Sequence, residues 1–439
     1  MQKLSKNTEK FDAIVIGSGP AGATSAYTLA SQGYSVLLLE KVEFPRFHIG
    51  ESMVPYIVEI FEKIGILDRL ESEGFVRKLG VDISLSSGEL GRANFADLAA
   101  GQKPYAFNLE RCRFDKILLE NAEEAGVRLL QRAEVKDLIL DGDRIVGVEY
   151  KYQQQNYQAM SPFVIDASGR AGIVAKHFKL RKMNPKLRNV AIFQQFDNAS
   201  EENNPAIEGD LIVGFHPDGW MWQIPLDDKT ISVGAVVPQT TFKTGSPQEI
   251  FDAHLSRLPR LKARVQGATP VFEKLKTELD FCYHSERFAG LGYFLVGDAA
   301  CFVDPQFSGG VYLGMLSGMK AAEAIADIFQ GKDEQKAFID YENFCKTGYD
   351  SYYRLIYAFY SCENYNVLKL FQSFPGGYKF MLQTMCGDLW GEPDQPVLSY
   401  LRSQEQWATF EEPFETVYGC PVYPNAGYKV ADEAADSLC

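Results

Sequence analysis

The feature that most constrains the fold is a strand, a glycine-rich turn, a helix and a second strand at the start of the chain. Residues 11–16 form a short apolar run of strand-forming residues, and the turn Gly-Ser-Gly-Pro-Ala-Gly follows at 17–22. A helical stretch comes next, and a second apolar run at 36–39 ends in Glu40. This order and spacing are typical of a parallel βαβ unit that binds a dinucleotide.

Each residue type in the turn has a physical reason to be there. Gly17 permits the tight turn, and Gly19 lets the backbone approach a diphosphate at the N-terminus of the helix. Gly22 lets the helix pack closely on the strand, and Glu40 is placed to accept hydrogen bonds from ribose hydroxyls.

Two further apolar strands end in an aspartate close to a glycine. Residues 163–170 read Phe-Val-Ile-Asp-Ala-Ser-Gly-Arg, and residues 291–298 end in Gly297 and Asp298. Because ligands of open α/β sheets bind at the carboxyl edge of the strands, we expect these junctions to converge there. An extended dinucleotide such as FAD needs that many contacts, so we predict an α/β fold built on a Rossmann-like FAD-binding domain.

Composition excludes several other classes of protein. The formal net charge is −14 and the sequence has no basic block, so nucleic-acid binding is not expected. No run of 18 apolar residues occurs, so no membrane-spanning helix is expected. The eight cysteines form no C-x-x-C pair, and the five histidines are scattered. We therefore expect no metal site, and reduced thiols in a cytoplasmic enzyme.

From about residue 10 to 335, the sequence resembles the FAD-binding fold of the p-hydroxybenzoate hydroxylase and geranylgeranyl reductase superfamily. In that superfamily, arginines placed like Arg46 in Phe-Pro-Arg and Arg113 in Arg-Phe-Asp lie near the flavin or its phosphates. A surface salt bridge remains open as the role of either arginine. The cofactor-binding residues that the resemblance implies are Gly17, Gly19, Ala21, Gly22, Glu40, Arg46, Arg113, Asp298, Pro305 and Gly310.

Three strings narrow the resemblance to the flavin-dependent halogenases, in their phenol-type branch. They are Trp-Met-Trp-Gln-Ile-Pro at 220–225, Phe-Val-Asp-Pro-Gln-Phe-Ser-Gly-Gly at 302–310, and the segment 40–55 that follows the ribose-binding glutamate. The resemblance implies that reduced FAD and O₂ give a flavin hydroperoxide, which chloride or bromide attacks. The resulting hypohalous acid then reaches a lysine beside the substrate.

The same resemblance assigns the remaining site residues. Lys78 lies just before an alternating strand pattern, as the family's lysine does, although the adjacent Arg77 leaves the register open by one. A surface lysine is the alternative. Ser308, Gly309 and Gly310 are expected to form the halide site, or else a glycine turn that only packs on the flavin. Trp220 and Trp222 share one face of a strand and are expected to wall the flavin side, or simply to fill the core.

Phe307 stands where the tryptophan-type halogenases carry a glutamate, so we predict a phenolic or similarly electron-rich aromatic substrate, free or tethered to a carrier protein. No second glycine fingerprint for a nicotinamide cofactor is present, and residues 166–169 read Asp-Ala-Ser-Gly. We therefore expect a separate flavin reductase to supply FADH₂. A related monooxygenase or double-bond reductase without halogenation, or a flavin-binding protein without turnover, remains the alternative.

The organisation predicted along the chain has two parts. Residues 1–335 form a discontinuous FAD-binding domain, with an antiparallel substrate-side sheet inserted at about 181–280, where strand patterns alternate. Residues 336–439 form a mostly helical C-terminal region, rich in tyrosine at 348–360. Overall, this is an α+β arrangement around an α/β core.

Overall fold

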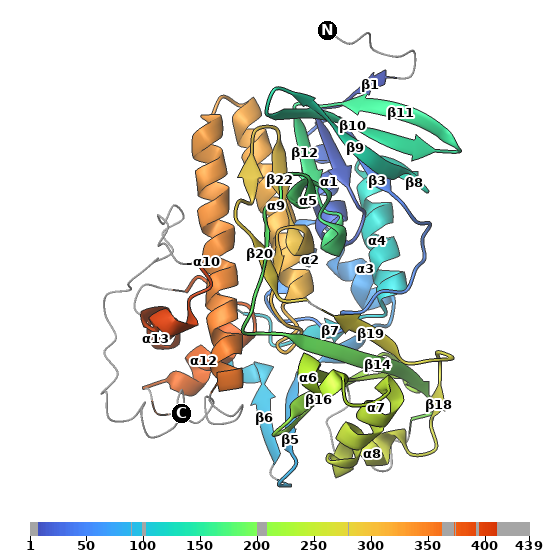
Figure 1. Cartoon of the computed structure of the whole chain (residues 1–439), viewed down its shortest axis with the longest axis vertical. Helices are drawn as coiled ribbons and strands as arrows, with labels where there is room; N and C mark the ends of the chain where they lie inside the picture. The colour runs from blue at the N-terminus through green and yellow to red at the C-terminus, as the bar shows by residue number, and fades with distance from the viewer. Residues whose placement is uncertain are drawn as a thin grey trace.

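The computed structural model describes residues 8–88, 90–98, 102–199, 209–279, 281–361, 373, 375–391 and 395–410. Figure 1 shows the arrangement: a layered nucleotide-binding half above a second large sheet, with long helices along one side. The structure confirms the predicted α/β core.

The central sheet has six strands in the order β21-β22-β12-β2-β3-β8. The pairs β12–β2, β2–β3, β3–β8 and β12–β22 are parallel, and only the edge strand β21 runs antiparallel. Its strands are β2 (Ala13–Ile16), β3 (Val36–Glu40), β8 (Arg128–Gln131), β12 (Phe163–Asp166), β21 (Ala289–Gly290) and β22 (Tyr293–Leu295). The strands β2, β3 and β12 are buried throughout, as their continuous apolar runs predict.

Small residues allow two helices to pack closely beside this sheet. Helix α1 (Pro20–Ala30) lies against α9 (Gly310–Phe329), and a Cβ added at Gly318 would sit 2.4 Å from the Ala21 carbonyl oxygen. Both helices start beside the carboxyl edge of the sheet, so their N-termini open towards the place where a dinucleotide is expected.

A four-stranded sheet caps the nucleotide-binding half, at the top of Figure 1. It contains β1 (Thr8–Lys10), β9 (Glu134–Asp141), β10 (Arg144–Tyr152) and β11 (Gln155–Met160). The remaining short strands are β4 (Val76–Lys78), β7 (Ala106–Asn108), β13 (Arg181–Met183), β20 (Tyr283–Ser285) and β23 (Cys301–Phe302). Short helices α2 (Ile57–Lys63), α3 (Leu67–Ser72) and α5 (Ile173–His177) and the longer α4 (Arg111–Glu124) complete this half.

The second large sheet has the order β18-β14-β17-β16-β15-β5-β6, with β19 also paired to β14. Its strands are β5 (Gly80–Leu85), β6 (Leu90–Asn94), β14 (Asn189–Asp197), β15 (Leu211–His216), β16 (Gly219–Pro225), β17 (Ile231–Pro238), β18 (Thr269–Pro270) and β19 (Lys276–Leu279). The sequence predicted an antiparallel sheet within 181–280. The structure corrects this in one respect, because β5 and β6 come from far upstream and β5 pairs parallel with β15.

Helices cover both sides of this lower sheet. Helices α6 (Gln239–Phe242), α7 (Pro247–Ser256) and α8 (Pro259–Val265) bury a separate apolar cluster on one face. The predicted boundary at 335/336 falls at the start of the long helix α10 (Glu334–Ser361), which is followed by α12 (Gly377–Met385) and α13 (Pro396–Ser403). Residues 411–439 of the predicted helical region lie outside the described residues. In the described part of the chain, no helix has the length and apolar character needed to cross a bilayer.

Candidate functional site

A cavity of about 710 Å³ opens at the carboxyl edge of the parallel sheet, between that sheet and the face of β16. Most residues predicted for the cofactor and halide sites line it. They are Gly17, Gly19, Ala21, Glu40, Arg46, Trp220, Trp222, Asp298, Pro305, Ser308 and Gly310. Segments nearly 300 residues apart in the sequence therefore meet at one place, as a long dinucleotide requires.

In the glycine turn at the base of the cavity, two of the three glycines leave no room for a side chain. Gly17 has a φ of +93°, and a Cβ there would lie 2.5 Å from the Ala167 carbonyl oxygen. A Cβ at Gly22 would lie 1.9 Å from the Gly17 carbonyl oxygen. These two glycines therefore bring the β2–α1 turn into direct backbone contact with the end of β12, which leaves the N-terminus of α1 open to a diphosphate.

Charged groups around the turn suit an anionic dinucleotide. The Arg46 guanidinium lies over the turn, because a Cβ at Gly19 would be 3.7 Å from its Nη2. Its buried Nη1 makes no hydrogen bond and lies 3.5 Å from Asp115 Oδ2. The Glu40 carboxylate accepts hydrogen bonds from the backbone N–H and the hydroxyl of Ser18. Burial raises the pKa of Asp298 to about 6. The glycine cradle and the Arg46 guanidinium beside it fit FAD.

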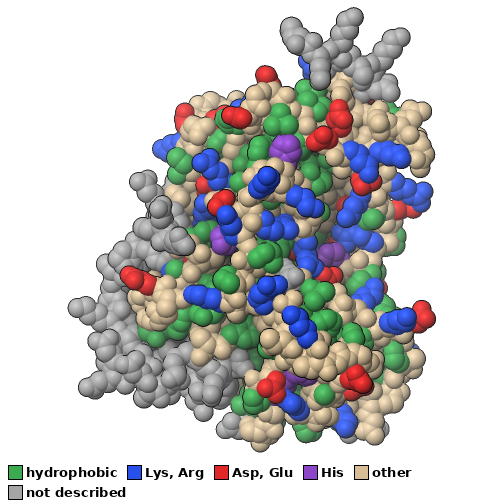
Figure 2. Space-filling view, viewed as in Figure 1, with side chains coloured by type: hydrophobic (Ala, Val, Ile, Leu, Met, Phe, Trp, Pro, Cys, Tyr) green, Lys and Arg blue, Asp and Glu red, His purple; other side chains and the backbone are tan. Residues whose placement is uncertain are grey.

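The surface around the cavity is locally basic although the chain is acidic overall. Residues 167–196 hold seven lysines and arginines and no acidic residue. Figure 2 shows Lys and Arg side chains gathered on the middle of this face, where Figure 1 has α5 and β20. Arg170 of this segment lines the cavity itself. This local charge favours the approach of an anionic cofactor.

The structure corrects one predicted cofactor residue. The Arg113 side chain is 43% exposed, bonds Glu73 and covers the ring of Phe75, so it does not line the cavity. Arg111 lines it instead. It is paired bidentately with Asp115 at 2.7 and 3.0 Å, and it donates to the Ile49 carbonyl at 2.8 Å.

The reason for this difference is helical phase. Both arginines lie in the first turn of α4, and positions two apart on a helix point in nearly opposite directions. The spacing of Arg111 and Asp115, four residues apart, is the sequence signal that could have identified the buried arginine.

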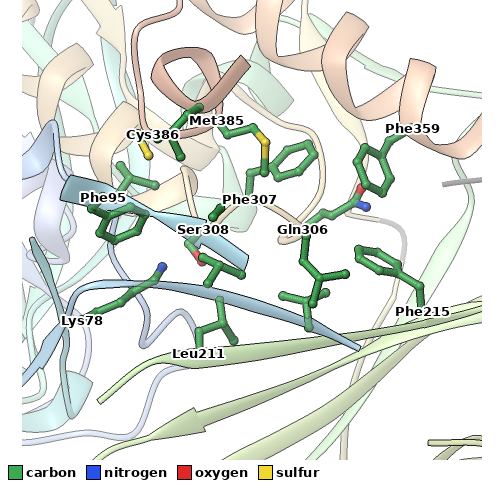
Figure 3. A pocket seen from close by; sticks show the side chains of 16 residues that line it. Lys78, Phe95, Leu211, Phe215, Gln306, Phe307, Ser308, Phe359, Met385 and Cys386 are labelled. Carbon is green, nitrogen blue, oxygen red and sulfur yellow. The ribbon is translucent and has the colours of Figure 1, made fainter. Parts of the chain in front are cut away.

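Lys78 is the buried amine at the second, smaller cavity, shown in Figure 3. Its side chain is only 2% exposed, and Nζ donates to the Ser52 hydroxyl and the Met53 carbonyl, each at 3.0 Å. Burial lowers its pKa to about 8. Neighbouring Arg77 is 54% exposed and pairs with Glu71, so of the two adjacent cations only Lys78 is buried at the pocket.

The two cavities share a wall. The smaller one, of about 40 Å³, is lined mainly by apolar side chains from β5, β6, β15, α10 and α12. Four residues line both cavities: Leu211 and Val213 from β15, and Gln306 and Ser308 from the loop before α9. We call these four residues the shared wall. Ser52, which accepts a hydrogen bond from Lys78 Nζ, also lines the large cavity, so the amine lies close to both cavities.

The predicted halide site is only partly open to the large cavity. Gly310 begins the 20-residue helix α9 and lines the cavity, and Ser308, with a φ of +58°, turns the chain into it. Gly309, however, does not line the cavity, because its N–H donates to the Tyr352 hydroxyl at 3.0 Å. In this structure one of the two predicted amide donors is therefore engaged by a side chain of α10.

The two predicted tryptophans face the large cavity from β16. Trp220 Nε1 donates to the Tyr360 hydroxyl at 2.7 Å, and Tyr360 in turn donates to Asp304 at 3.0 Å. Trp222 lies directly over Gly234 of β17, where a Cβ would lie 2.1 Å from its ring. Both indoles are thus held rigidly as a wall of the cavity.

Besides Arg111, sequence reasoning missed two buried polar residues at this site. Glu51 lines the large cavity, is 1% exposed, and leaves Oε2 without a hydrogen-bond partner. Burial raises the pKa of Glu51 to about 7. Gln306 lines both cavities, and neither atom of its carboxamide has a partner. The string Gly-Glu-Ser at 50–52 was a signal for Glu51, but nothing local in the sequence singles out Gln306.

A dinucleotide cradle at the carboxyl edge of a parallel sheet, with a second small cavity holding a buried lysine, is the arrangement of an FAD-binding protein. The family model described as FAD binding domain matches residues 10–348. Tryptophan 2-halogenase of Chondromyces crocatus is 36% identical over 79% of this chain and 66% of its own length. The chain belongs to the flavin-dependent halogenases of this FAD-binding family.

Other relatives match over more of their length. The 1H-pyrrole-2-carbonyl-[peptidyl-carrier protein] chlorinase of Pseudomonas fluorescens is 29% identical over 89% of this chain and 92% of its own. The structure of the flavin-dependent brominase Bmp2 superposes with a TM-score of 0.82 at 27% identity, covering 90% of this chain and 98% of Bmp2. By contrast, the chain spans 64–66% of the length of tryptophan 2-halogenase and of two flavin-dependent halogenases from Armillaria mellea.

Proposed function

We propose that this protein is an FADH₂- and O₂-dependent halogenase that places chloride or bromide on an electron-rich aromatic ring. The observation that carries this proposal is Lys78, a buried amine in an apolar pocket that shares a wall with the cofactor cavity. Bound reduced FAD, with O₂ and halide, supplies hypohalous acid in the large cavity. Lys78 is the one amine among the residues that line the smaller cavity.

The environment of Lys78 prepares it to accept halogen. With a pKa of about 8, roughly one amine in ten is neutral at pH 7, against about one in three thousand at the ordinary pKa. A neutral amine reacts with hypohalous acid to form a nitrogen–halogen bond and release water. A protonated amine instead donates a hydrogen bond to the acid and polarises it. The apolar lining limits the water that competes for the acid.

The pocket around Lys78 favours a phenolic or similarly electron-rich substrate. Among its described lining residues there is no aspartate or glutamate, and Phe307 contributes a ring to the lining. A carboxylate that stabilises a cationic ring intermediate is therefore lacking on this side. An electron-rich ring depends less on that help, because its own O–H or N–H supplies electrons and releases a proton as the halogen adds.

The substrate is presented on a carrier protein in this proposal. Two curated relatives are named for pyrrole-2-carbonyl groups on a peptidyl-carrier protein, and one of them matches over 92% of its length. A pocket of about 40 Å³ is smaller than the cavity of about 150 Å³ that holds a benzene ring, so a ring must widen it on entry. A tether helps by raising the local concentration of the ring.

A separate flavin reductase completes the system, because the chain offers one glycine fingerprint and the large cavity is formed around it. We place the protein in the reducing cytoplasm. The five cysteines in the described ranges, Cys112, Cys282, Cys301, Cys345 and Cys386, are all unbridged, which fits such a compartment.

The test is mass spectrometry of products from phenols and pyrroles, free and carrier-bound, with FAD, a generic flavin reductase, NADH, O₂ and bromide. We expect products with the bromine isotope doublet from the wild type and the Arg77→Ala control, and none from Lys78→Ala. The control changes the adjacent but exposed side chain. Hydroxylated products, or brominated products that persist in Lys78→Ala, would contradict the proposal.

A further inference from the structure

Gln306 is a buried side chain whose polar atoms have no partner in the protein. It is 3% exposed, and both Oε1 and Nε2 lack hydrogen bonds. Its backbone is held in place, because its N–H donates to Asp304 Oδ1 at 3.0 Å. A buried donor and acceptor left unpaired are unfavourable, so a side chain kept in this state is explained by a ligand that pairs with it.

The position of Gln306 points to a ligand in the smaller cavity. In the view of Figure 3, Lys78 and Gln306 lie at opposite ends of this cavity, and the Gln306 carboxamide is directed towards Phe359. In that view Ser308 lies between them, Leu211 lies on the β15 side, and Phe215 and Phe359 lie at the Gln306 end. An aromatic ring between the two ends would meet the amine on one side and the carboxamide on the other.

A carboxamide recognises a particular kind of edge. It presents a carbonyl acceptor and an N–H donor side by side, so it pairs best with a group that presents a donor and an acceptor in the matching order. A ring N–H or O–H next to a carbonyl substituent forms such an edge. The other polar side-chain atoms that line the cavity, on Lys78, Ser308 and Cys386, do not offer this combination.

We propose that Gln306 binds the polar edge of the substrate, a ring that carries an N–H or O–H donor beside a carbonyl, and so turns the opposite carbons towards Lys78. This proposal rests on the halogenase function proposed above, and it adds the substrate class and the origin of regioselectivity. Gln306 acts as a specificity-determining residue, since the halogen comes from Lys78.

The first experiment measures binding to the FAD-loaded, oxidised enzyme by calorimetry, without halide or turnover. Methyl pyrrole-2-carboxylate carries the ring N–H beside the carbonyl, whereas methyl thiophene-2-carboxylate has a similar shape and no donor. We expect the wild type to bind the pyrrole about tenfold to a hundredfold more tightly, because the thiophene leaves Oε1 unpaired. Gln306→Met keeps the length and apolar volume of the side chain. In this variant, we expect the affinities for the pyrrole and the thiophene to differ by less than about twofold.

Two controls separate this role from other roles. Gln158→Met changes a glutamine on the exposed strand β11 and is expected to keep the wild-type ratio. The dissociation constant for FAD is measured in each variant. Weaker FAD binding in Gln306→Met with an unchanged probe ratio would assign the carboxamide to the cofactor and overturn the proposal. So would equal binding of the two probes to the wild type, or no saturable binding of either.

Turnover with bromide distinguishes a failure of this proposal from a failure of the proposed function. We expect the wild type to brominate the pyrrole mainly at one position and Gln306→Met to give a mixture. An unchanged product pattern in Gln306→Met would refute the orienting role while leaving the halogenase function intact. If the wild type bound the pyrrole more tightly than the thiophene but gave no brominated product, the halogenase function would be refuted. Gln306 would then remain a recognition residue.

Discussion

Replacing Lys78 by methionine should make the protein more stable while removing its activity. The lysine is fully buried, and its pKa falls from 10.5 to about 8 because burial disfavours the charged form. A lowering of about 2.5 units corresponds to a penalty of about 3 kcal/mol in the folded state at pH 7. Methionine has a similar length and carries no charge, so it removes this penalty.

The net gain is smaller than the penalty because two hydrogen bonds disappear. The amine donates to the Ser52 hydroxyl and the Met53 carbonyl, and each such bond contributes about 1 kcal/mol. We therefore expect Lys78→Met to raise the free energy of unfolding by about 1–2 kcal/mol at pH 7.

The dependence on pH gives the sharper test. The folded-state pKa lies below the unfolded value, so the penalty is fully present below about pH 8 and vanishes as the pH rises through 10.5. At pH 9.5 the penalty is about 1 kcal/mol, which is about 2 kcal/mol less than at pH 7. The stability advantage of Lys78→Met over the wild type should shrink by that amount between these two pH values.

The assay is urea unfolding of the wild type, Lys78→Met and Arg77→Met at pH 7 and pH 9.5, followed by tryptophan fluorescence. Arg77 is exposed and stays protonated, so its variant is expected to remain within about 0.5 kcal/mol of the wild type at both values. If Lys78→Met were less stable at pH 7, or its advantage did not change with pH, the lysine would carry no desolvation penalty. A lysine without this penalty would be almost fully protonated at neutral pH.

Three further outcomes test the cofactor and halide sites. Arg111→Leu should weaken FAD binding at least tenfold, whereas Arg113→Leu should change it less than about twofold. Flavin fluorescence measures both, and equal effects would contradict the assignment of Arg111 rather than Arg113 to the cofactor cavity. Gly17→Ala should lower the melting temperature and abolish FAD retention on a desalting column, because its Cβ would lie 2.5 Å from a carbonyl oxygen; a variant that retains FAD would show that the turn can move. Tyr352→Phe should free the Gly309 amide and lower the KM for bromide severalfold. The free energy of unfolding should fall by about 1–2 kcal/mol. An unchanged KM would mean that the halide does not bind this amide.

The parts of the fold that depend on local pattern could be predicted from the sequence. The turn at 17–22 needs glycines for reasons confined to a few residues, and the buried parallel strands have continuous apolar runs. The pairing of β5 with β15 joins segments about 130 residues apart. Nothing in either strand specifies that partner, so the lower sheet was predicted with two strands missing.

The site residues divide in the same way, into those that a motif marks and those that only the packed structure identifies. Lys78, Glu40 and the glycines are marked by motifs and line the cavities or shape them. Arg111 was missed because the choice between two arginines depends on helical phase at the first turn of α4. Gln306 was missed because what distinguishes it is the absence of hydrogen-bond partners, a property of the packed interior that no motif encodes.

The shared wall has a consequence for redesign of substrate range. Trimming Leu211 or Val213 to admit a larger ring would also widen the opening to the cofactor side, so that reactive acid leaks past Lys78 without meeting a substrate. Enlargement from the opposite side, at Phe95 of the 3₁₀ turn after β6 or at Leu382 and Met385 of α12, leaves the shared wall intact. Evolution towards bulkier substrates is therefore expected to change the residues on the side of α12 and to spare the shared wall.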